Sequence, residues 1–344
     1  MTPSSLVLAF ALGCTGRAPL PEVPVTTRTT PEVDGLRAEL QVDGPLEQRL
    51  AAPDDADLVL LHGAEEDGSL DSCGCQHRPR GGVARQAAYR DAVQARDPDL
   101  PVLLLNAGGW LSGETDIDGR TRPDVPQRNA WMVRGLALLA PTALNVGTSE
   151  LRALPDLPAG LPALPLVSAH LHAGAPIEVP VVDRLVVEAG DLTVGITGIA
   201  ASGPAWMAPE GWTVEDPEAA ARRVLAELQD QADVVVLMAD ALPEVARELA
   251  EDGLADVVID AWHHRSFSAP FRVGDAVWVR AHHGTMRIGE LRAVVADGRV
   301  VRAVERSIDL DESMPERPDI ADVADRARQE LRRLERLTFG SSRR

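Results

Sequence analysis

The sequence contains no lysine, and all 34 of its basic residues are arginines. Schiff-base catalysis and a phosphate-binding P-loop are therefore excluded, because both need a lysine amine. Aromatic residues are also scarce, at 3% of the chain, which disfavours sites that stack sugars between rings. Basic residues are outnumbered by the 53 acidic ones, so the formal net charge is −19. We therefore expect no nucleic-acid partner, since such binding needs net positive charge.

The rest of the composition is typical of a globular protein. Apolar residues make up 45% and charged residues 25% of the 344 positions, and a chain of this length can bury a large core. Short apolar runs alternate with amphipathic stretches, which predicts α/β layers, and a late run of strands predicts a second sheet. Strands are predicted at 58–61, 102–105, 143–146, 164–169, 181–187, 192–199, 233–238, 256–259 and within 276–306, and helices at 81–96, 124–139, 215–231, 244–252 and 319–337.

The amino terminus has the pattern of an export signal. Residues 6–13 form an apolar run that is too short to span a bilayer and has the length of a signal-peptide core. Cys14 follows a glycine at the end of this run, which resembles the lipobox of bacterial lipoproteins, where the cysteine carries the lipid. A plain signal peptide with an incidental cysteine is the alternative. We expect an extracytoplasmic protein, on the periplasmic side or at the outer membrane, whose membrane partner is reached through the lipid anchor.

The segment after Cys14 is rich in proline, threonine and valine, a composition that favours an extended chain. We therefore divide the sequence into four parts. They are a lipoprotein signal peptide at 1–13, an extended tether at 14–55, one folded domain at 56–310, and a C-terminal helix and tail at 311–344.

The densest local signal is a pair of cysteines, Cys73 and Cys75, within residues 68–75 (Gly-Ser-Leu-Asp-Ser-Cys-Gly-Cys). Two thiols separated by one glycine can share a soft metal ion or act as a redox pair, and a disulfide between them would be strained and easily reduced. Basic residues at 77, 78 and 80 would favour the thiolate if they face the sulfurs. Two unrelated small residues in a loop is the alternative.

This block and the segments around it resemble a bacterial branch of the calcineurin-like metallophosphoesterases, near the periplasmic 5′-nucleotidases. That branch carries a strand, then Gly-x-Leu-x-x-Cys-Gly-Cys, then Gly-Gly-(Leu/Val)-Ala-Arg, then a strand ending in Asp-Ala-Gly-Asp. Here the second and third blocks read Gly-Gly-Val-Ala-Arg at 81–85 and Asn-Ala-Gly-Gly at 106–109. The resemblance covers residues 57–310. It implies a four-layer α/β/β/α sandwich of the metallo-dependent phosphatase type, and a nucleotide or phosphate ester as the ligand.

The resemblance also implies that most metal ligands of that family are absent. The family holds two cations with Asp-x-His, Gly-Asp, Gly-Asn-His-(Asp/Glu), a lone His and Gly-His-x-His, and the cations polarise phosphate and activate water. The first four places here fall on residues 65–67, on Gly109 without the bridging carboxylate, on 147–150 without Asn or His, and near Asp240. The last falls on 261–264, where only His264 matches. A two-metal centre is therefore not expected. We expect a protein without ordinary phosphatase activity that binds a ligand or an unidentified partner, or that acts through Cys73 and Cys75.

A rebuilt mononuclear zinc-type site is the alternative, and with it a metal-dependent phosphohydrolase, either a nucleotidase or a phosphodiesterase. Its candidate ligands are Glu65, Asp67, His170, His172, Asp240, His264 and His282. His170 and His172 would share a face if the chain is extended there. Loop and surface histidines are the other interpretation.

Overall fold

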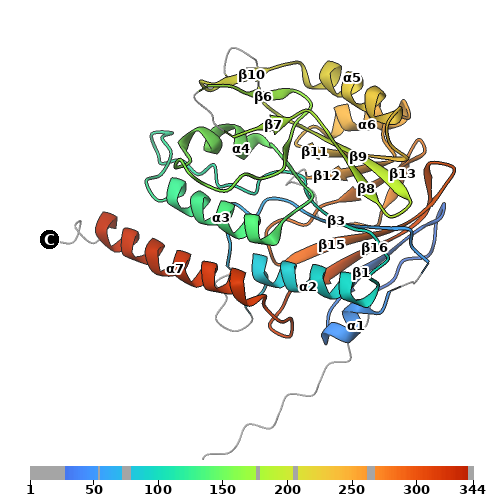
Figure 1. Ribbon diagram of the computed structural model, residues 1–344, viewed down its shortest axis with the longest axis horizontal. Coiled ribbons are helices and arrows are strands. Elements are labelled where there is room, and N and C mark those ends of the chain that lie inside the picture. The colour runs from blue at the N-terminus through green and yellow to red at the C-terminus, as the bar shows by residue number, and fades with distance from the viewer. Residues whose placement is uncertain are drawn as a thin grey trace, which may run out of the picture.

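Two β-sheets lie face to face at the centre of the computed structural model, which describes residues 28–52, 55–71, 79–175, 179–203, 208–261 and 268–339 (Figure 1). The first sheet has the strand order β1 (Leu36–Val42), β16 (Arg299–Asp309), β15 (Arg287–Ala296), β2 (Leu58–Gly63), β3 (Val102–Asn106), β4 (Ala143–Asn145), β5 (Leu166–Val167) and β7 (Val181–Val182). The second has the order β13 (Phe271–Val273), β14 (Ala276–Arg280), β12 (Val257–Asp260), β11 (Val234–Asp240), β9 (Leu192–Ala200) and β8 (Leu185–Ala189). A short pair, β10 (Trp212–Val214) and β6 (Leu171–Ala173), completes the strands described.

Helices cover the outer face of each sheet. The first sheet is covered by α2 (Val83–Arg96), α3 (Val125–Leu139) and α7 (Pro318–Phe339), with the short α1 (Leu46–Leu50) near its edge, and the second by α5 (Pro217–Gln229) and α6 (Pro243–Glu251). After β4 come α4 (Thr148–Ala153) and a 3-10 turn, η1 (Leu154–Asp156). The order of layers is α/β/β/α, so the predicted fold class is confirmed.

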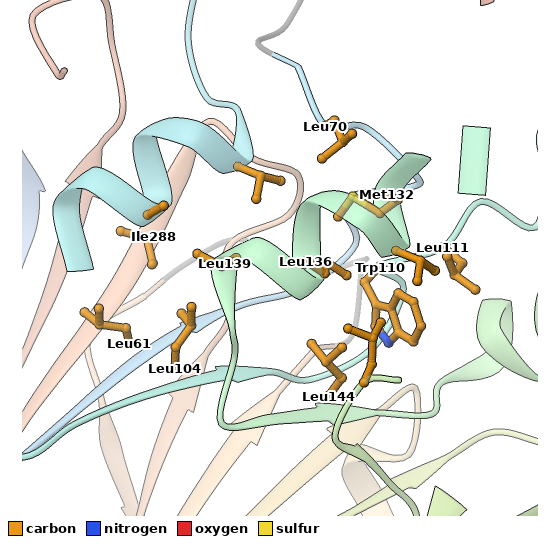
Figure 2. Packing of buried hydrophobic residues seen from close by; sticks show 14 of the residues in the cluster. Leu61, Leu70, Leu104, Trp110, Leu111, Met132, Leu136, Leu139, Leu144 and Ile288 are labelled. Carbon is orange, nitrogen blue, oxygen red and sulfur yellow. The ribbon is translucent and has the colours of Figure 1, made fainter. Parts of the chain in front are cut away.

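The apolar run of β2 explains how the layers are held. Leu58 and Leu60 face the second sheet, whereas Val59 and Leu61 face the helices, and all four are fully buried. A strand buried on both faces reads as a continuous apolar run. In Figure 2, Leu61 lies on the helix side of the sheet, below Leu139 of α3.

The strand β1 corrects the predicted tether at 14–55. Residues 36–42 pair in parallel with β16, and Leu36, Ala38 and Val42 are buried. The alternation of apolar and polar residues in this stretch is a strand signal. The proline-rich composition of the whole interval hides that signal. The folded body therefore includes residues on the amino-terminal side of position 56.

One predicted strand differs from the structure. The expected strand at 181–187 is divided, since β7 pairs with β5 in the first sheet and β8 pairs in antiparallel with β9 in the second. The C-terminal helix packs on α2 and α3, with Ile320 fully buried.

Of the helices in the described ranges, none is both long and apolar enough to cross a membrane.

Candidate functional site

The two sheets meet at the carboxyl ends of their parallel strands. The Ala64 N–H after β2 donates to the His282 carbonyl after β14 at 3.0 Å. The amide of Asn145, at the end of β4, donates to the Ile199 carbonyl of β9 at 3.0 Å. This shared rim, which we call the carboxyl edge, is where α/β sheets commonly place their ligands.

Gly108 and Gly109 form the tightest part of the carboxyl edge. Both have positive φ angles, 126° and 74°. A β-carbon on Gly108 would lie 3.1 Å from the β-carbon of Asp240, and one on Gly109 would lie 2.9 Å from the α-carbon of Glu65. Contacts this short leave no room for a side chain. At Gly109, where the resemblance would require a bridging carboxylate, the backbone of Glu65 takes the space.

Glu150 fixes the turns that surround this glycine pair. One carboxylate oxygen accepts the N–H groups of Gly109 and Gly147, both at 3.0 Å, and the other accepts that of Leu111 at 2.7 Å. Burial raises the pKa of Glu150 to about 8, although these backbone donors lower it, and the nearby Asp240 carboxylate adds to the rise. Glu150 therefore serves as an internal acceptor, and it is protonated over much of the neutral range.

Asp240 lies at the end of β11 and is 4% exposed. Its Oδ2 accepts the N–H of Thr148 at 2.6 Å, at the start of α4. A β-carbon on Gly147 would lie 2.6 Å from the same oxygen and 2.8 Å from Oε2 of Glu150. Asp240 thus stands where the resemblance places the lone metal-binding histidine, and it contributes to the closure of the edge.

Glu65 and His283 form the more open part of the edge. His283 Nδ1 lies 3.3 Å from Oε2 of Glu65, and both side chains are 31% exposed. The strand ends hold the pair in place, since the Gly284 N–H donates to the Glu65 carbonyl at 2.9 Å. This carboxylate–imidazole pair is accessible to a ligand from solvent.

Glu66 is a buried acid that was not among the candidate ligands, and Glu150 and His283 were also left out of that set. Its Oε2 accepts the Asn106 amide N–H at 2.7 Å. Burial raises the pKa of Glu66 to about 7, although the bond from Asn106 lowers it. The signal that could have identified these residues was position, because each lies within five residues of a strand end.

The structure brings only some of the predicted site residues together. Glu65 and Asp240 flank the glycine pair. The Asp67 N–H donates to the Gly109 carbonyl at 3.0 Å, and burial raises the pKa of the Asp67 carboxyl, although Ser112 lowers it through a hydrogen bond. His282 lies after β14 and is mostly buried, which lowers its pKa to about 3.

His170 and His172 lie in different surroundings. His170 is fully buried beside the Ser168 hydroxyl, at 3.3 Å, and burial lowers its pKa to about 4. His172 is 35% exposed and lies 2.8 Å from Glu215. His264, Cys14, Cys73 and Cys75 lie outside the described residues.

The described residues do not fit a two-metal centre. Within the ranges given above, no three His, Cys, Asp or Glu residues are grouped so that they could hold a metal ion. The place where the resemblance expects the bridging carboxylate falls on Gly109, which has no space for a side chain. The acids beside it are engaged with backbone N–H groups. No reaction step is therefore assigned to a metal pair here.

Comparison with solved structures shows which fold this is. The chain is similar to the sulfate thiohydrolase SoxB of Thermus thermophilus, with a TM-score of 0.65 and 14% identity over 80% of this chain and 61% of that one. A 5′-nucleotidase precursor from the same species has a TM-score of 0.63 and 19% identity, over 80% of this chain and 59% of that one. The NAD nucleotidase of Haemophilus influenzae has a TM-score of 0.63 and 12% identity, over 81% of this chain and 61% of that one. The fold is that of the metallo-dependent phosphatases.

These similarities extend to the fold alone. The chain spans about 60% of the length of each of these three proteins. No protein-family model matches the sequence, and no curated protein does so either. The fold expected from the cysteine-containing block is confirmed, and activity has to be argued from the site itself.

Proposed function

We propose that this chain is a relative of the 5′-nucleotidases that binds a ligand or partner at its carboxyl edge without two-metal hydrolysis. One observation carries the proposal. The resemblance puts the bridging carboxylate at Gly109, and a β-carbon there would lie 2.9 Å from the backbone of Glu65. Two cations held close together need a bridging anionic ligand to offset their repulsion. With that ligand replaced by packed backbone, the fold remains and the phosphoesterase chemistry is lost.

The charge of the edge narrows the ligand class. Among the described residues its accessible groups include the Glu65 carboxylate and the His283 imidazole, whereas Asp240 is buried. A bare phosphate meets repulsion from these acids unless a cation accompanies it. A ligand that presents hydrogen-bond donors or a cationic group fits better. A nucleotide would bind through its base or ribose, with its phosphates directed toward solvent.

Hydrolysis assays test the proposal directly. The full chain is assayed on nucleoside monophosphates and on a phosphodiester with added Mn²⁺, Zn²⁺ or Mg²⁺. We expect no turnover above background with any ion. Metal-dependent turnover that disappears in Glu65→Ala and persists in the exposed control Glu188→Ala would instead establish the alternative, a phosphohydrolase with a rearranged mononuclear site.

We further propose that Cys14 carries a lipid and that the folded body is extracytoplasmic. The support is the apolar run followed by Gly-Cys, and the proline-rich segment that separates it from β1. Labelling of bacterial cells with an alkyne fatty acid should mark the wild-type chain but not Cys14→Ser. A wild-type chain that stays unlabelled would contradict the anchor.

A thiol role for Cys73 and Cys75 is the second candidate function, and it rests on their spacing. The structure describes the residues on either side of the two cysteines, up to Asp71 and from residue 79 onward. Arg328 of α7 pairs with Asp71, and Arg80 lies 3.2 Å from Asp309. Both flanks are therefore held against the C-terminal part of the chain. Thiol titration of the native protein should find a reactive pair that Cys73→Ser removes, whereas two inert thiols would exclude this role.

A further inference from the structure

A cavity lies next to the carboxyl edge, between α3 and the segment that follows α4. Its volume is about 520 Å³, within the range of about 300–1,000 Å³ typical of small-molecule sites. Its lining comes from the first part of the β3–α3 connection, from α3, and from residues 154–166 and 179–180. The inner wall belongs to the core cluster in which Trp110 packs against Leu144 (Figure 2).

Among the residues that the structure describes, those that line this cavity are all apolar, and one of them is a glycine. The residues are Trp110, Val133, Leu154, Pro155, Leu157, Pro158, Ala159, Gly160, Leu161, Pro162, Ala163, Leu164, Leu166, Val179 and Pro180. The indole N–H of Trp110 donates to the Asn145 carbonyl at 3.0 Å. A charged group inside the cavity would lose its hydration without gaining a charged or hydroxyl partner, which is costly. The lining therefore selects an uncharged apolar occupant.

The outer wall of the cavity is stiff. Residues 157–165 have no helix or strand. Proline fixes φ near −65° and so limits how far a segment can move inward. Pro155, Pro158 and Pro162 are distributed along this wall, and Pro180 stands on the neighbouring segment. The wall therefore holds the cavity open, even though apolar side chains would gain from closing it.

Burial changes from one end of the cavity to the other. Trp110, Val133 and Leu166 are buried at its floor, whereas Pro158 and Ala163 are exposed at its rim. An occupant with one apolar tail and one uncharged polar end would match this gradient. Its tail would lie against the floor, and its polar end would lie just inside the rim, where it is only partly hydrated and a charge would be penalised.

We propose that this cavity binds the acyl chain of an uncharged single-chain lipid. The proposal is independent of the function proposed for the carboxyl edge, because none of the cavity residues belongs to the groups described there. Binding would bury apolar surface of both molecules and would show the negative heat-capacity change that accompanies such burial.

Calorimetric titration of the full chain with decanol tests the proposal, with decanoate as the charged counterpart. We expect saturable 1:1 binding of decanol with a negative heat-capacity change, and at least about tenfold weaker binding of decanoate because the lining offers its charge no partner. Absence of saturable decanol binding, or equal binding of decanoate, would overturn the proposal.

Two variants locate the binding. Val133→Phe fills the floor and Leu161→Asp places a charge on the half-buried wall, and each should weaken decanol binding by about tenfold or more. Leu161→Asp keeps the test decisive if Val133→Phe fails to fold. The control Val186→Phe adds the same ring on β8, at a valine that is 43% exposed and outside the lining, and should bind as the wild type does. Unchanged binding in a folded Val133→Phe or in Leu161→Asp would overturn the assignment.

Discussion

Buried carboxylates occur in two regions of this molecule, and their partners differ. Under α1, Glu290 accepts hydrogen bonds from Arg306 at 3.0 Å, from Arg292 at 2.6 Å, and from the Tyr89 hydroxyl. At the carboxyl edge, Glu150 accepts hydrogen bonds from three backbone N–H groups. Burial alone would raise the pKa of Glu290, but Arg306 and Arg292 outweigh it and hold that pKa below its usual range. Burial raises the pKa of Glu150 to about 8.

The comparison shows two ways in which this fold stabilises a buried carboxyl group. In the Glu290 region, fixed guanidinium groups keep the acid ionised. Arg306 also links the sheet to β1 through Glu39 and to α1 through the Arg49 carbonyl. At the carboxyl edge, the same residue type is stabilised by backbone dipoles and by a proton. In this fold the resemblance would place cations at that edge. Here Glu150 and Asp240 accept hydrogen bonds from backbone N–H groups, whereas Glu65 stays accessible beside His283.

The largest expected effect is the removal of the guanidinium from the Glu290 region. Arg306→Met leaves Glu290 with one less counter-charge in a fully buried setting, so we expect a loss of about 3–5 kcal/mol in the free energy of unfolding. Urea denaturation measures it. Arg299→Met is the control, because its ion pair with Asp275 is well exposed and should contribute less than about 1 kcal/mol. A loss as small as the control's would show that the network is not structural.

The second prediction concerns Glu150. In Glu150→Ala the N–H groups of Gly109, Leu111 and Gly147 lose their acceptor, which should cost about 3 kcal/mol of stability. The same denaturation experiment applies, with the exposed Glu188→Ala as the control. If Glu150→Ala were as stable as Glu188→Ala, the edge would not be held closed by this carboxyl group.

The third prediction separates crowding from backbone conformation at the glycine pair. Gly109→Ala should destabilise the fold by about 2 kcal/mol, through positive φ and the short approach to Glu65 together. Gly119 has a φ of 77° but nothing within 4 Å of an added β-carbon, so Gly119→Ala reports the conformational cost alone. Equal losses in the two variants would mean that the space beside Glu65 is open, and would contradict the closed edge.

The last prediction is a pH dependence of stability on the alkaline side. The folded protein holds protons on Glu66 and Glu150 more tightly than the unfolded chain does, with pKa values of about 7 and about 8 against 4.5. The stability from this difference is fully present below pH 4.5 and is lost as the pH rises through 7 to 8.

On the acid side the sign is opposite for the buried histidines. The pKa values of His170 and His282, about 4 and about 3 in the fold against 6.5 in the unfolded chain, give stability that is lost as the pH falls from 6.5 through 4 and 3. Urea midpoints from pH 5 to 9 should therefore decline above about pH 6. Asp240→Asn should make that alkaline decline shallower, because the Asp240 charge raises the pKa of Glu150. A flat profile above pH 6 in the wild type would contradict the protonated edge.

Much of the fold could be predicted from the sequence, because buried strands leave a local signal. The Leu58–Leu61 run and the Asp233–Met238 run correspond closely to β2 and β11. β1 was missed because its alternating pattern lies in a segment whose average composition is that of a linker.

The site was harder to predict, since its geometry depends on distant segments. The absence of a carboxylate at Gly109 can be noticed in the sequence. Whether a side chain would fit there depends on Glu65, which approaches from the segment after β2. The partners of Glu150 depend on turns after two strands that are far apart along the chain. Spacing also placed His170 and His172 on one face, whereas the fold buries one and exposes the other.

The metal content of the purified protein tests the central claim most directly. The chain is purified without chelator and measured by elemental analysis, beside a Cys73→Ser/Cys75→Ser variant that removes thiolate ligation. The account predicts far less than one equivalent of any divalent metal in the thiol-free variant. Near-stoichiometric metal in that variant, lost in Glu65→Ala and retained in Glu188→Ala, would contradict a carboxyl edge closed by its own hydrogen bonds.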